Sequence, residues 1–161
     1  MTTVSSSPEL PAIGWREWIT LPGLGITGIK AKIDTGALSS ALHAFDIEIF
    51  KKQDLDFVRF KVHPYQFNDT DTVTAEAVLF DVRNVRNSGG QAQSRPVIKT
   101  NIVLGEQLWP IELTLTNRDV MGFRMLLGRQ AVRRRYLVDS GRSYLRSSKK
   151  KRKQTLSSPT S

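Results

Sequence analysis

The chain is divided into short runs in which apolar and polar residues alternate, and it contains little helical periodicity. Ile29, Ala31 and Ile33 alternate with two lysines, and the same two-residue period recurs at residues 45–49 and 58–62. Successive side chains of a strand point to opposite faces, so this pattern indicates strands with one buried face. Gly, Pro, Asn and Asp separate the runs at intervals of about ten residues, which is typical of a small all-β domain.

Two hairpins, a further strand and one helix can be placed on this pattern. Residues 97–104 and 109–115 predict a hairpin about Gly105-Glu106, and residues 136–138 and 144–145 predict another about Asp139-Ser140-Gly141. A strand is expected at residues 72–80, and a short helix after Gly128 at residues 130–134. We expect one closed or sandwiched all-β domain over residues 14–145, between a disordered segment (residues 1–13) and a disordered basic tail (residues 146–161).

Composition excludes several classes of protein. The 161 residues include no cysteine, so a disulfide-stapled scaffold, a cysteine-ligated zinc finger, an iron–sulfur site and a thiol nucleophile are excluded. No run approaches the roughly 18 apolar residues that span a bilayer, and the first 13 residues lack the layout of a signal peptide. We therefore expect a soluble, cytoplasmic protein without a membrane partner.

The positive charge is concentrated in the tail. The chain has 24 Lys and Arg against 15 Asp and Glu, a net charge of +9, but six of the basic residues lie in residues 146–161, which hold no acid. Residues 1–145 therefore carry 18 − 15 = +3. Such a like-charge tail either keeps the protein in solution or contacts nucleic acid, the ribosome, an acidic partner or an import receptor.

No nucleotide or metal site is predicted. The string Gly23-Leu24-Gly25-Ile26-Thr27-Gly28 has the spacing of a dinucleotide fingerprint, but a strand pattern follows it where that motif requires a helix, so we interpret it as a hairpin turn. There is no P-loop motif. The two histidines, His43 and His63, lie in separate elements, and we expect neither a bound metal nor a cofactor.

The most informative string is Asp34-Thr35-Gly36, which follows an alternating strand and precedes several small residues. Downstream, Met125-Leu126-Leu127-Gly128-Arg129 predicts a buried strand that ends in glycine and leads into the short helix. This pairing resembles the retropepsin family of aspartic proteases, in which a D-T-G loop crosses beneath an apolar strand ending in glycine. With Gly14–Trp18 and Ser40–Ala44 added, the chain is similar to bacterial retropepsin-like endopeptidases historically labelled putative ATP-dependent zinc proteases.

The resemblance covers the chain except its two tails, and it implies a retropepsin-like closed β-barrel with one short helix. Peptide hydrolysis without a nucleophilic side chain needs one carboxylate as general base and a second, protonated carboxyl as acid. Each chain has one D-T-G, so we expect a symmetric homodimer with Asp34 contributed twice. By the resemblance, Thr35 braces the two loops and Gly36 sets the turn, with structural support from Leu126, Leu127, Gly128 and Arg129.

Several residues are candidates for substrate binding. Ala37 and His43 follow the D-T-G closely, although His43 also fits a hydrogen-bonded strand histidine. Three arginines flank the turn at residues 87–90, a candidate flap tip, and they are either solvated charges or a clamp for an anionic substrate: Arg83, Arg86 and Arg95. The family is associated with ATP-grasp ligases that add glutamates to a ribosomal protein, so the resemblance implies a glutamate-rich peptide substrate. The "ATP-dependent" and "zinc" parts of the label have no support in these residues.

Two other functions stay open from the sequence. A catalytically silent small barrel could contact RNA or the ribosome through its basic tail. A true metallopeptidase would recruit scattered Asp and Glu as ligands and would carry stoichiometric zinc. The aspartic endopeptidase is the leading hypothesis of the three.

Overall fold

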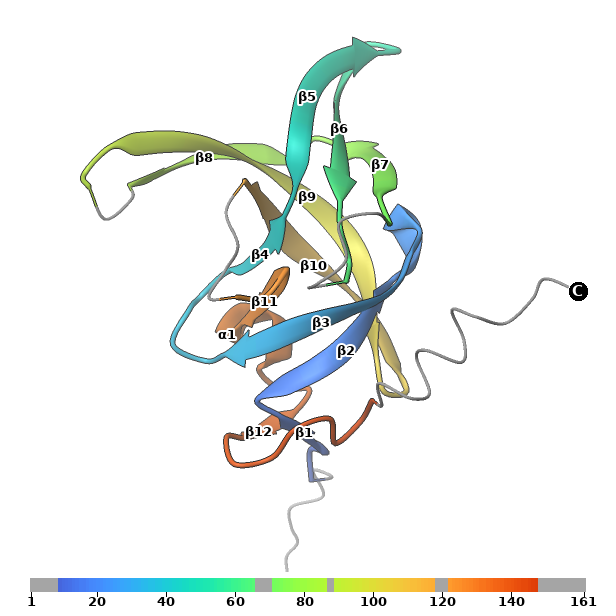
Figure 1. Ribbon diagram of the computed structural model, residues 1–161, viewed down its shortest axis with the longest axis vertical. Coiled ribbons are helices and arrows are strands. Elements are labelled where there is room, and N and C mark those ends of the chain that lie inside the picture. The colour runs from blue at the N-terminus through green and yellow to red at the C-terminus, as the bar shows by residue number, and fades with distance from the viewer. Residues whose placement is uncertain (1–8, 66–70, 87–88, 118–121, 148–161) are drawn as a thin grey trace, which may run out of the picture.

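The structure is a computed structural model that describes residues 9–65, 71–86, 89–117 and 122–147 (Figure 1). These residues form twelve strands, a short 3-10 helix η1 (Pro22–Leu24) and one α-helix, α1 (Arg129–Val132). The strands are β1 (Ala12–Gly14), β2 (Arg16–Leu21), β3 (Ile26–Asp34), β4 (Ser40–His43), β5 (Phe45–Lys52), β6 (Leu55–Val62), β7 (Val73–Val78), β8 (Asp81–Arg86), β9 (Ala92–Leu104), β10 (Gln107–Thr116), β11 (Met125–Gly128) and β12 (Leu137–Asp139).

Six of the strands close a barrel. Neighbouring strands follow the order β10-β4-β11-β3-β2-β9, and β9 pairs with β10 to complete the ring. Strand β11 lies between β3, to which it is parallel, and β4, to which it is antiparallel. The expected all-β closed barrel with one short helix is confirmed, although α1 begins at Arg129, one residue earlier than expected.

The barrel is held by side chains that alternate into its interior. Ile98, Ile102 and Leu104 of β9 are fully buried, as are Leu113 of β10 and Leu127 of β11. Each such side chain contributes about 1.5–3 kcal/mol through the apolar surface it buries. The predicted hairpin about Gly105-Glu106 joins β9 to β10 and is confirmed. The closed ring fixes the ends of β3 and β11 and the start of β4, where the candidate site lies.

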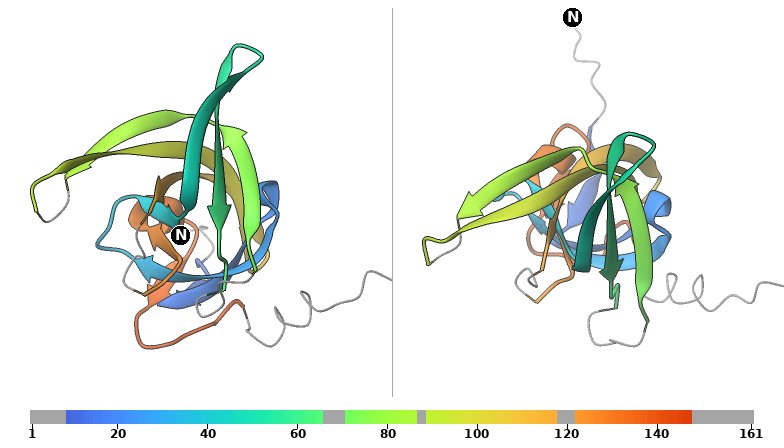
Figure 2. Two further views of the ribbon diagram at one scale, coloured as in Figure 1. Left: turned by 45° about the horizontal axis from the view of Figure 1, so that its top comes forward. Right: turned by 90° about the horizontal axis from the view of Figure 1, so that it is seen from above.

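Two hairpins project from the barrel (Figures 1 and 2). One is β5–β6, which forms a separate three-stranded sheet with β7. The other is β8–β9, in which Arg83 lies opposite Arg95 and Arg86 opposite Ala92. The strand expected at residues 72–80 is shorter in the structure, since β7 ends at Val78 and the chain turns directly into β8.

The predicted hairpin of residues 136–138 with 144–145 is wrong. The turn at Asp139-Ser140-Gly141 is present, with the Gly141 amide donating to Asp139 Oδ1 at 2.9 Å. However, β12 pairs in parallel with β1, and the Tyr144 amide donates to the carbonyl of Arg16 at 3.0 Å. The partners of this segment lie at the other end of the chain, so the local pattern could not reveal them.

Residues at both edges of the expected domain belong to the folded body. Ile13 in β1 is fully buried, and the Ser147 hydroxyl donates to Glu17 Oε1 at 2.7 Å. The expected disordered segments, residues 1–13 and 146–161, therefore overlap the ordered domain at both ends. Residues 1–8 and 148–161 lie outside the described residues, so the expectation for them stays a prediction.

The glycine-rich string is a turn, as expected. Gly23 lies in η1, Gly25 adopts a left-handed conformation with φ of +72°, and β3 begins at Ile26. The string therefore leads into a strand that pairs antiparallel with β2, where a dinucleotide motif would lead into a helix.

Candidate active site

The D-T-G loop begins where β3 ends. Asp34 is the last residue of β3, and its Oδ1 accepts a hydrogen bond from the Gly36 amide at 3.0 Å. The Ala37 amide donates to the Asp34 carbonyl at 3.2 Å, which closes the turn. Asp34 is half-buried, whereas Thr35 and Gly36 are exposed. The loop therefore fixes the Asp34 carboxylate and leaves it open to one side.

Strand β11 crosses against this loop, and Gly128 is the point of contact. Gly128 lies beside Asp34 in the parallel pairing of β11 with β3. A Cβ on Gly128 would stand 2.4 Å from the carbonyl oxygen of Ser39, closer than real Cβ atoms approach any neighbour. Only glycine fits there, and Leu126 and Leu127 before it are buried in the domain.

The start of α1 holds the loop by its backbone. The Arg129 amide donates to the carbonyl of Ala37 at 2.7 Å, and the Gln130 amide donates to that of Leu38 at 3.1 Å. The Arg129 guanidinium donates to the Thr35 carbonyl at 3.0 Å. The support expected from Arg129 thus takes the form of hydrogen bonds to the loop backbone.

Ser40 is a further support, to which the sequence gave no role. Its hydroxyl is buried and accepts a hydrogen bond from the Gly128 amide at 3.0 Å. Without this hydroxyl, the Gly128 amide at the end of β11 would lose this hydrogen-bond acceptor, which costs free energy. Ser40 belongs both to the run of small residues after the D-T-G and to the string Ser40–Ala44, but neither pattern gave its hydroxyl a role.

A cavity of about 350 Å³ opens next to the loop, and four basic side chains line it with one acidic side chain. The loop contributes Ser39, which is followed by the buried Ser40. The charged residues are Arg83, Lys99, Arg133, Arg135 and Glu112. The excess of positive charge makes this cavity attractive to an anionic group.

The cations of the cavity are held in different ways. Arg83 donates to Glu112 Oε1 at 2.7 Å and to Asp81 Oδ2 at 3.1 Å. The hydrogen bond to Glu112 raises the pKa of the Arg83 guanidinium above its ordinary value. Lys99 lies over the ring of Phe80, with its Nζ 4.2 Å from the ring centroid. The Arg135 guanidinium stacks on the buried Trp109 at 4.9 Å.

Of the other predicted substrate-binding residues, Ala37 belongs to the loop itself and the arginines are dispersed. Arg95 lies in a second cavity, also about 350 Å³, between β5 and β9, and it donates to Gln93. Arg86 is exposed near the end of β8. Of the candidate flap tip, residues 87 and 88 lie outside the described residues, and Gly89 and Gly90 are exposed. The structure brings only Arg83 of the three arginines into the cavity beside the loop.

The structure does not bring His43 to Asp34. Strand β4 runs away from the loop, so His43 lies three residues beyond Ser40, which is about 10 Å along a strand. Its Nδ1 lies 3.1 Å from Nη1 of Arg124, the residue before β11. His43 therefore fits the alternative interpretation, a hydrogen-bonded strand histidine.

No metal centre and no membrane-crossing helix can be assigned in the described part of the chain. Within it, no group of three or more His, Asp or Glu side chains is placed to hold a metal ion. The other histidine, His63, has its Nδ1 3.3 Å from the hydroxyl of Thr72. Nor does any helix among these residues have the length and apolar content that crossing a membrane requires.

Comparison with known proteins identifies related sequences. The family model described as "Retropepsin-like aspartic endopeptidase RimB" matches residues 12–149. A probable alpha-L-glutamate ligase of Parasynechococcus marenigrum is 50% identical over 127 residues, which cover 79% of this chain and 27% of the relative. One of Shewanella pealeana is 44% identical over 132 residues, covering 82% of this chain and 29% of the relative. The chain thus spans less than a third of the length of these curated relatives.

A solved structure shares the fold. It is the protein Lpg0085, of unknown function, from Legionella pneumophila, with a TM-score of 0.68 and 30% sequence identity. The similarity covers 85% of this chain and 98% of the other, so the two have the same architecture nearly throughout.

Proposed function

Because this chain belongs to the family of the retropepsin-like aspartic endopeptidase RimB, we propose that it is an aspartic peptidase that works as a homodimer. The observation that carries the proposal is the crossing of β11 and α1 against the Asp34 loop. Hydrogen bonds to the backbone of Thr35, Ala37 and Leu38 fix that loop and leave its carboxylate accessible.

The reaction needs a second carboxylate close to the first. Asp34 is the one acidic residue between Glu17 and Asp46, so the loop region of a single chain supplies one carboxyl group. A second protomer related by a two-fold axis would supply the other. Two carboxyls about 3 Å apart cannot both ionise, so they share one proton.

In the proposed mechanism the ionised Asp34 takes a proton from water as the water oxygen attacks the carbonyl carbon of the substrate. The protonated Asp34 of the other protomer donates a hydrogen bond to the carbonyl oxygen. The C–N bond then breaks, and a carboxyl proton passes to the amine nitrogen that leaves. The hairpin β8–β9 would close over the substrate as a flap.

The proposed substrate is a glutamate-rich peptide, such as a glutamate tail on a ribosomal protein, and the proposed place of action is the cytoplasm. Two observations support this substrate. The cavity beside the loop holds four cations against one acid. The curated relatives that contain a similar segment are each named "Probable alpha-L-glutamate ligase", and that name refers to the ligation of glutamate. Guanidinium groups bind carboxylates in a bidentate manner, which suits Arg133 and Arg135 in this cavity.

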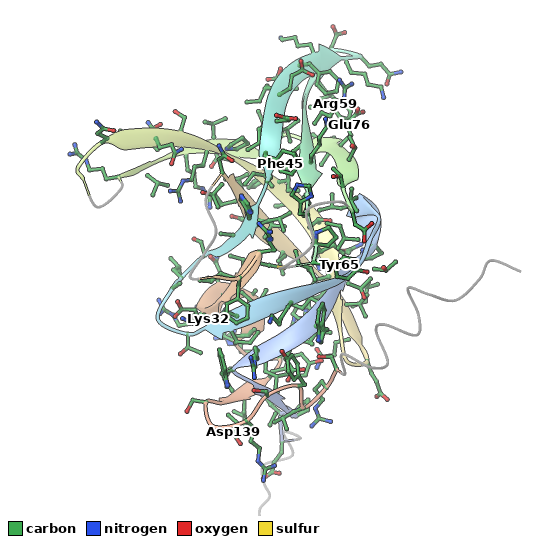
Figure 3. All side chains as sticks on the ribbon, in the orientation of Figure 1. Lys32, Phe45, Arg59, Tyr65, Glu76 and Asp139 are labelled. Atoms are coloured by element: carbon green, nitrogen blue, oxygen red, sulfur yellow. The ribbon has the colours of Figure 1, made fainter. Side chains whose placement is uncertain are left out.

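Replacement of one oxygen of Asp34 tests the catalytic role. Asp34→Asn keeps the shape of the side chain and its bond from Gly36, but removes the base, so hydrolysis of a peptide ending in several glutamates should fall by roughly 10²- to 10⁴-fold. Mass spectrometry of the products measures the loss. Asp139→Asn is the matched control, because Asp139 accepts the Gly141 amide in a similar turn at 2.9 Å and lies on β12, apart from the candidate site (Figure 3). Equal peptide hydrolysis by Asp34→Asn and the control would contradict the assignment of an aspartic peptidase.

The alternative function, a silent barrel that contacts RNA or the ribosome through its tail, stays a prediction. Residues 148–161, which hold most of the tail charge, lie outside the described residues. RNA binding that disappears on deletion of residues 148–161, together with unchanged peptide hydrolysis in Asp34→Asn, would favour it.

A further inference from the structure

We infer that the cavity beside the candidate catalytic loop is a carboxylate-binding subsite that the chain fills with its own Glu112, and that an acidic ligand binds by replacing Glu112 on Arg83. The inference rests on the proposed function for the kind of ligand, and on the contacts of Arg83 for the mechanism. It makes Glu112 a residue that sets affinity for acidic peptides.

The geometry places an acid where a ligand carboxylate would be held. Glu112 of β10 and Arg83 of β8 line the same cavity, which Ser39 of the catalytic loop also lines. The Glu112 Oε1 accepts from Arg83 Nη2 at 2.7 Å. This is the length of a strong charge-assisted hydrogen bond.

Arg83 does not depend on Glu112 for its orientation. Its Nε donates to Asp81 Oδ2 at 3.1 Å, and Asp81 is not among the residues that line the cavity. If Glu112 moves aside, Asp81 still holds the guanidinium, and the Nη2 that faced Glu112 becomes available to a ligand.

The exchange costs little because the pair is partly in water. The side chains of Arg83 and Glu112 are 39% and 35% exposed, and ion pairs as exposed as this contribute little to stability. A ligand carboxylate would also meet Lys99, Arg133 and Arg135, which together outnumber the single acid of the cavity. Lys99 and Arg135 are already held by aromatic rings, so a ligand would not need to order them.

A second ion pair in the molecule provides a matched comparison. Glu76 of β7 accepts from Arg59 Nη2 at 3.2 Å, and its side chain is also 35% exposed. Figure 3 shows this pair on the projecting sheet, and neither residue is among those lining the cavity beside the loop. Replacement of Glu76 changes the net charge as replacement of Glu112 does, but frees no cation in that cavity.

The test measures binding separately from hydrolysis. Full-length Asp34→Asn protein is titrated with tetraglutamate, and with tetraglutamine as the uncharged control, by isothermal titration calorimetry. Adding Glu112→Gln should tighten tetraglutamate binding about three- to five-fold, because the internal competitor is gone. Adding Glu76→Gln should leave the affinity unchanged, and adding Arg83→Gln should weaken it.

Several results would overturn the inference. Equal tightening by Glu112→Gln and Glu76→Gln would show a general charge effect. Unchanged or weaker binding in Glu112→Gln would show that Glu112 only supports Arg83, and absence of tetraglutamate binding to every variant would show that the cavity is no such subsite. Because all proteins carry Asp34→Asn, these results do not depend on whether Asp34 is catalytic.

Discussion

Glu17 is the polar residue that holds the two ends of the described chain together. Its carboxylate is fully buried and accepts four hydrogen bonds: from the amides of Gly14, Leu145 and Arg146 and from the hydroxyl of Ser147. Three of these donors lie at the C-terminal end, about 130 residues away in sequence, with separations of 128 to 130. A buried carboxylate is tolerated when its lone pairs are satisfied in this way.

Glu17→Gln should destabilise the fold strongly. Glutamine replaces one acceptor oxygen by an NH₂ group, which would face backbone donors that need an acceptor. The expected loss in the free energy of unfolding is about 2–4 kcal/mol, measured by urea denaturation. The exposed Glu106 provides the control, since Glu106→Gln should change the free energy by less than about 0.5 kcal/mol. A small effect at Glu17 would mean that the segment from Leu145 to Ser147 contributes little to stability.

Gly128→Ala should also destabilise, for a steric reason. The added methyl group would stand 2.4 Å from the Ser39 carbonyl oxygen and 2.6 Å from its carbon, so backbone must move. We expect the free energy of unfolding, measured by thermal denaturation, to fall by about 1–3 kcal/mol. Peptidase activity should also fall, because the Asp34 loop shifts. Gly141→Ala, whose methyl group would stand 3.5 Å from its nearest neighbour, is the control and should be close to neutral.

At the scale of elements, the contact of β11 with β4 depends on one hydroxyl. Ser40→Ala removes the acceptor for the Gly128 amide and should lower the free energy of unfolding by about 1–3 kcal/mol. Ser39→Ala removes an identical group from the adjacent, exposed position and should be nearly neutral. Urea denaturation of both variants measures the difference. Equal effects in the two would contradict the importance given to the Ser40–Gly128 bond.

The elements that the sequence predicted correctly are those whose partners are near in the chain. The β9–β10 hairpin turns at Gly105-Glu106 as expected. The pairing of β12 with β1 was missed because its register depends on residues at the opposite end of the chain. The role of Glu17 was missed for the same reason, because no local pattern distinguishes it from a surface glutamate.

The residues of the candidate site also fall into two groups, those that a short string predicts and those that only the fold brings together. Asp34 and Gly128 were predicted because each belongs to a short string whose residue types the crossing requires. Lys99, Glu112 and Arg133 were not predicted, because the cavity is assembled from β9, β10 and the end of α1, which only the closed barrel brings together. Nearness in sequence misled us about His43, since a strand of four residues carries it away from the loop.

At the scale of the whole molecule, stability should fall at alkaline pH through buried tyrosine. Burial raises the pKa of Tyr136, whose hydroxyl donates to the Leu104 carbonyl. A raised pKa means that the folded state keeps a proton that the unfolded state loses. The stability that the buried, neutral Tyr136 contributes is therefore fully present below about pH 10 and is lost as the pH rises above it. The stability difference between the wild-type protein and Tyr136→Phe, measured in urea at pH 8 and 10.5, should therefore shrink at the higher pH. A constant difference would contradict the assignment.

A homodimer with one shared site makes a quantitative prediction for mixed subunits. If both Asp34 carboxyls are needed, a dimer of one wild-type and one Asp34→Asn protomer is inactive. After subunit exchange at equal concentrations, random pairing leaves half of the wild-type chains in wild-type dimers, so activity per wild-type chain should fall to about half, and to about a quarter at a three-fold excess of the variant. Unmixed wild-type protein at the same total concentration is the reference, and Asp139→Asn in place of Asp34→Asn should cause no loss. Activity that is independent of added Asp34→Asn would show that each chain acts alone, and the second carboxyl group would then have to come from elsewhere in the same chain.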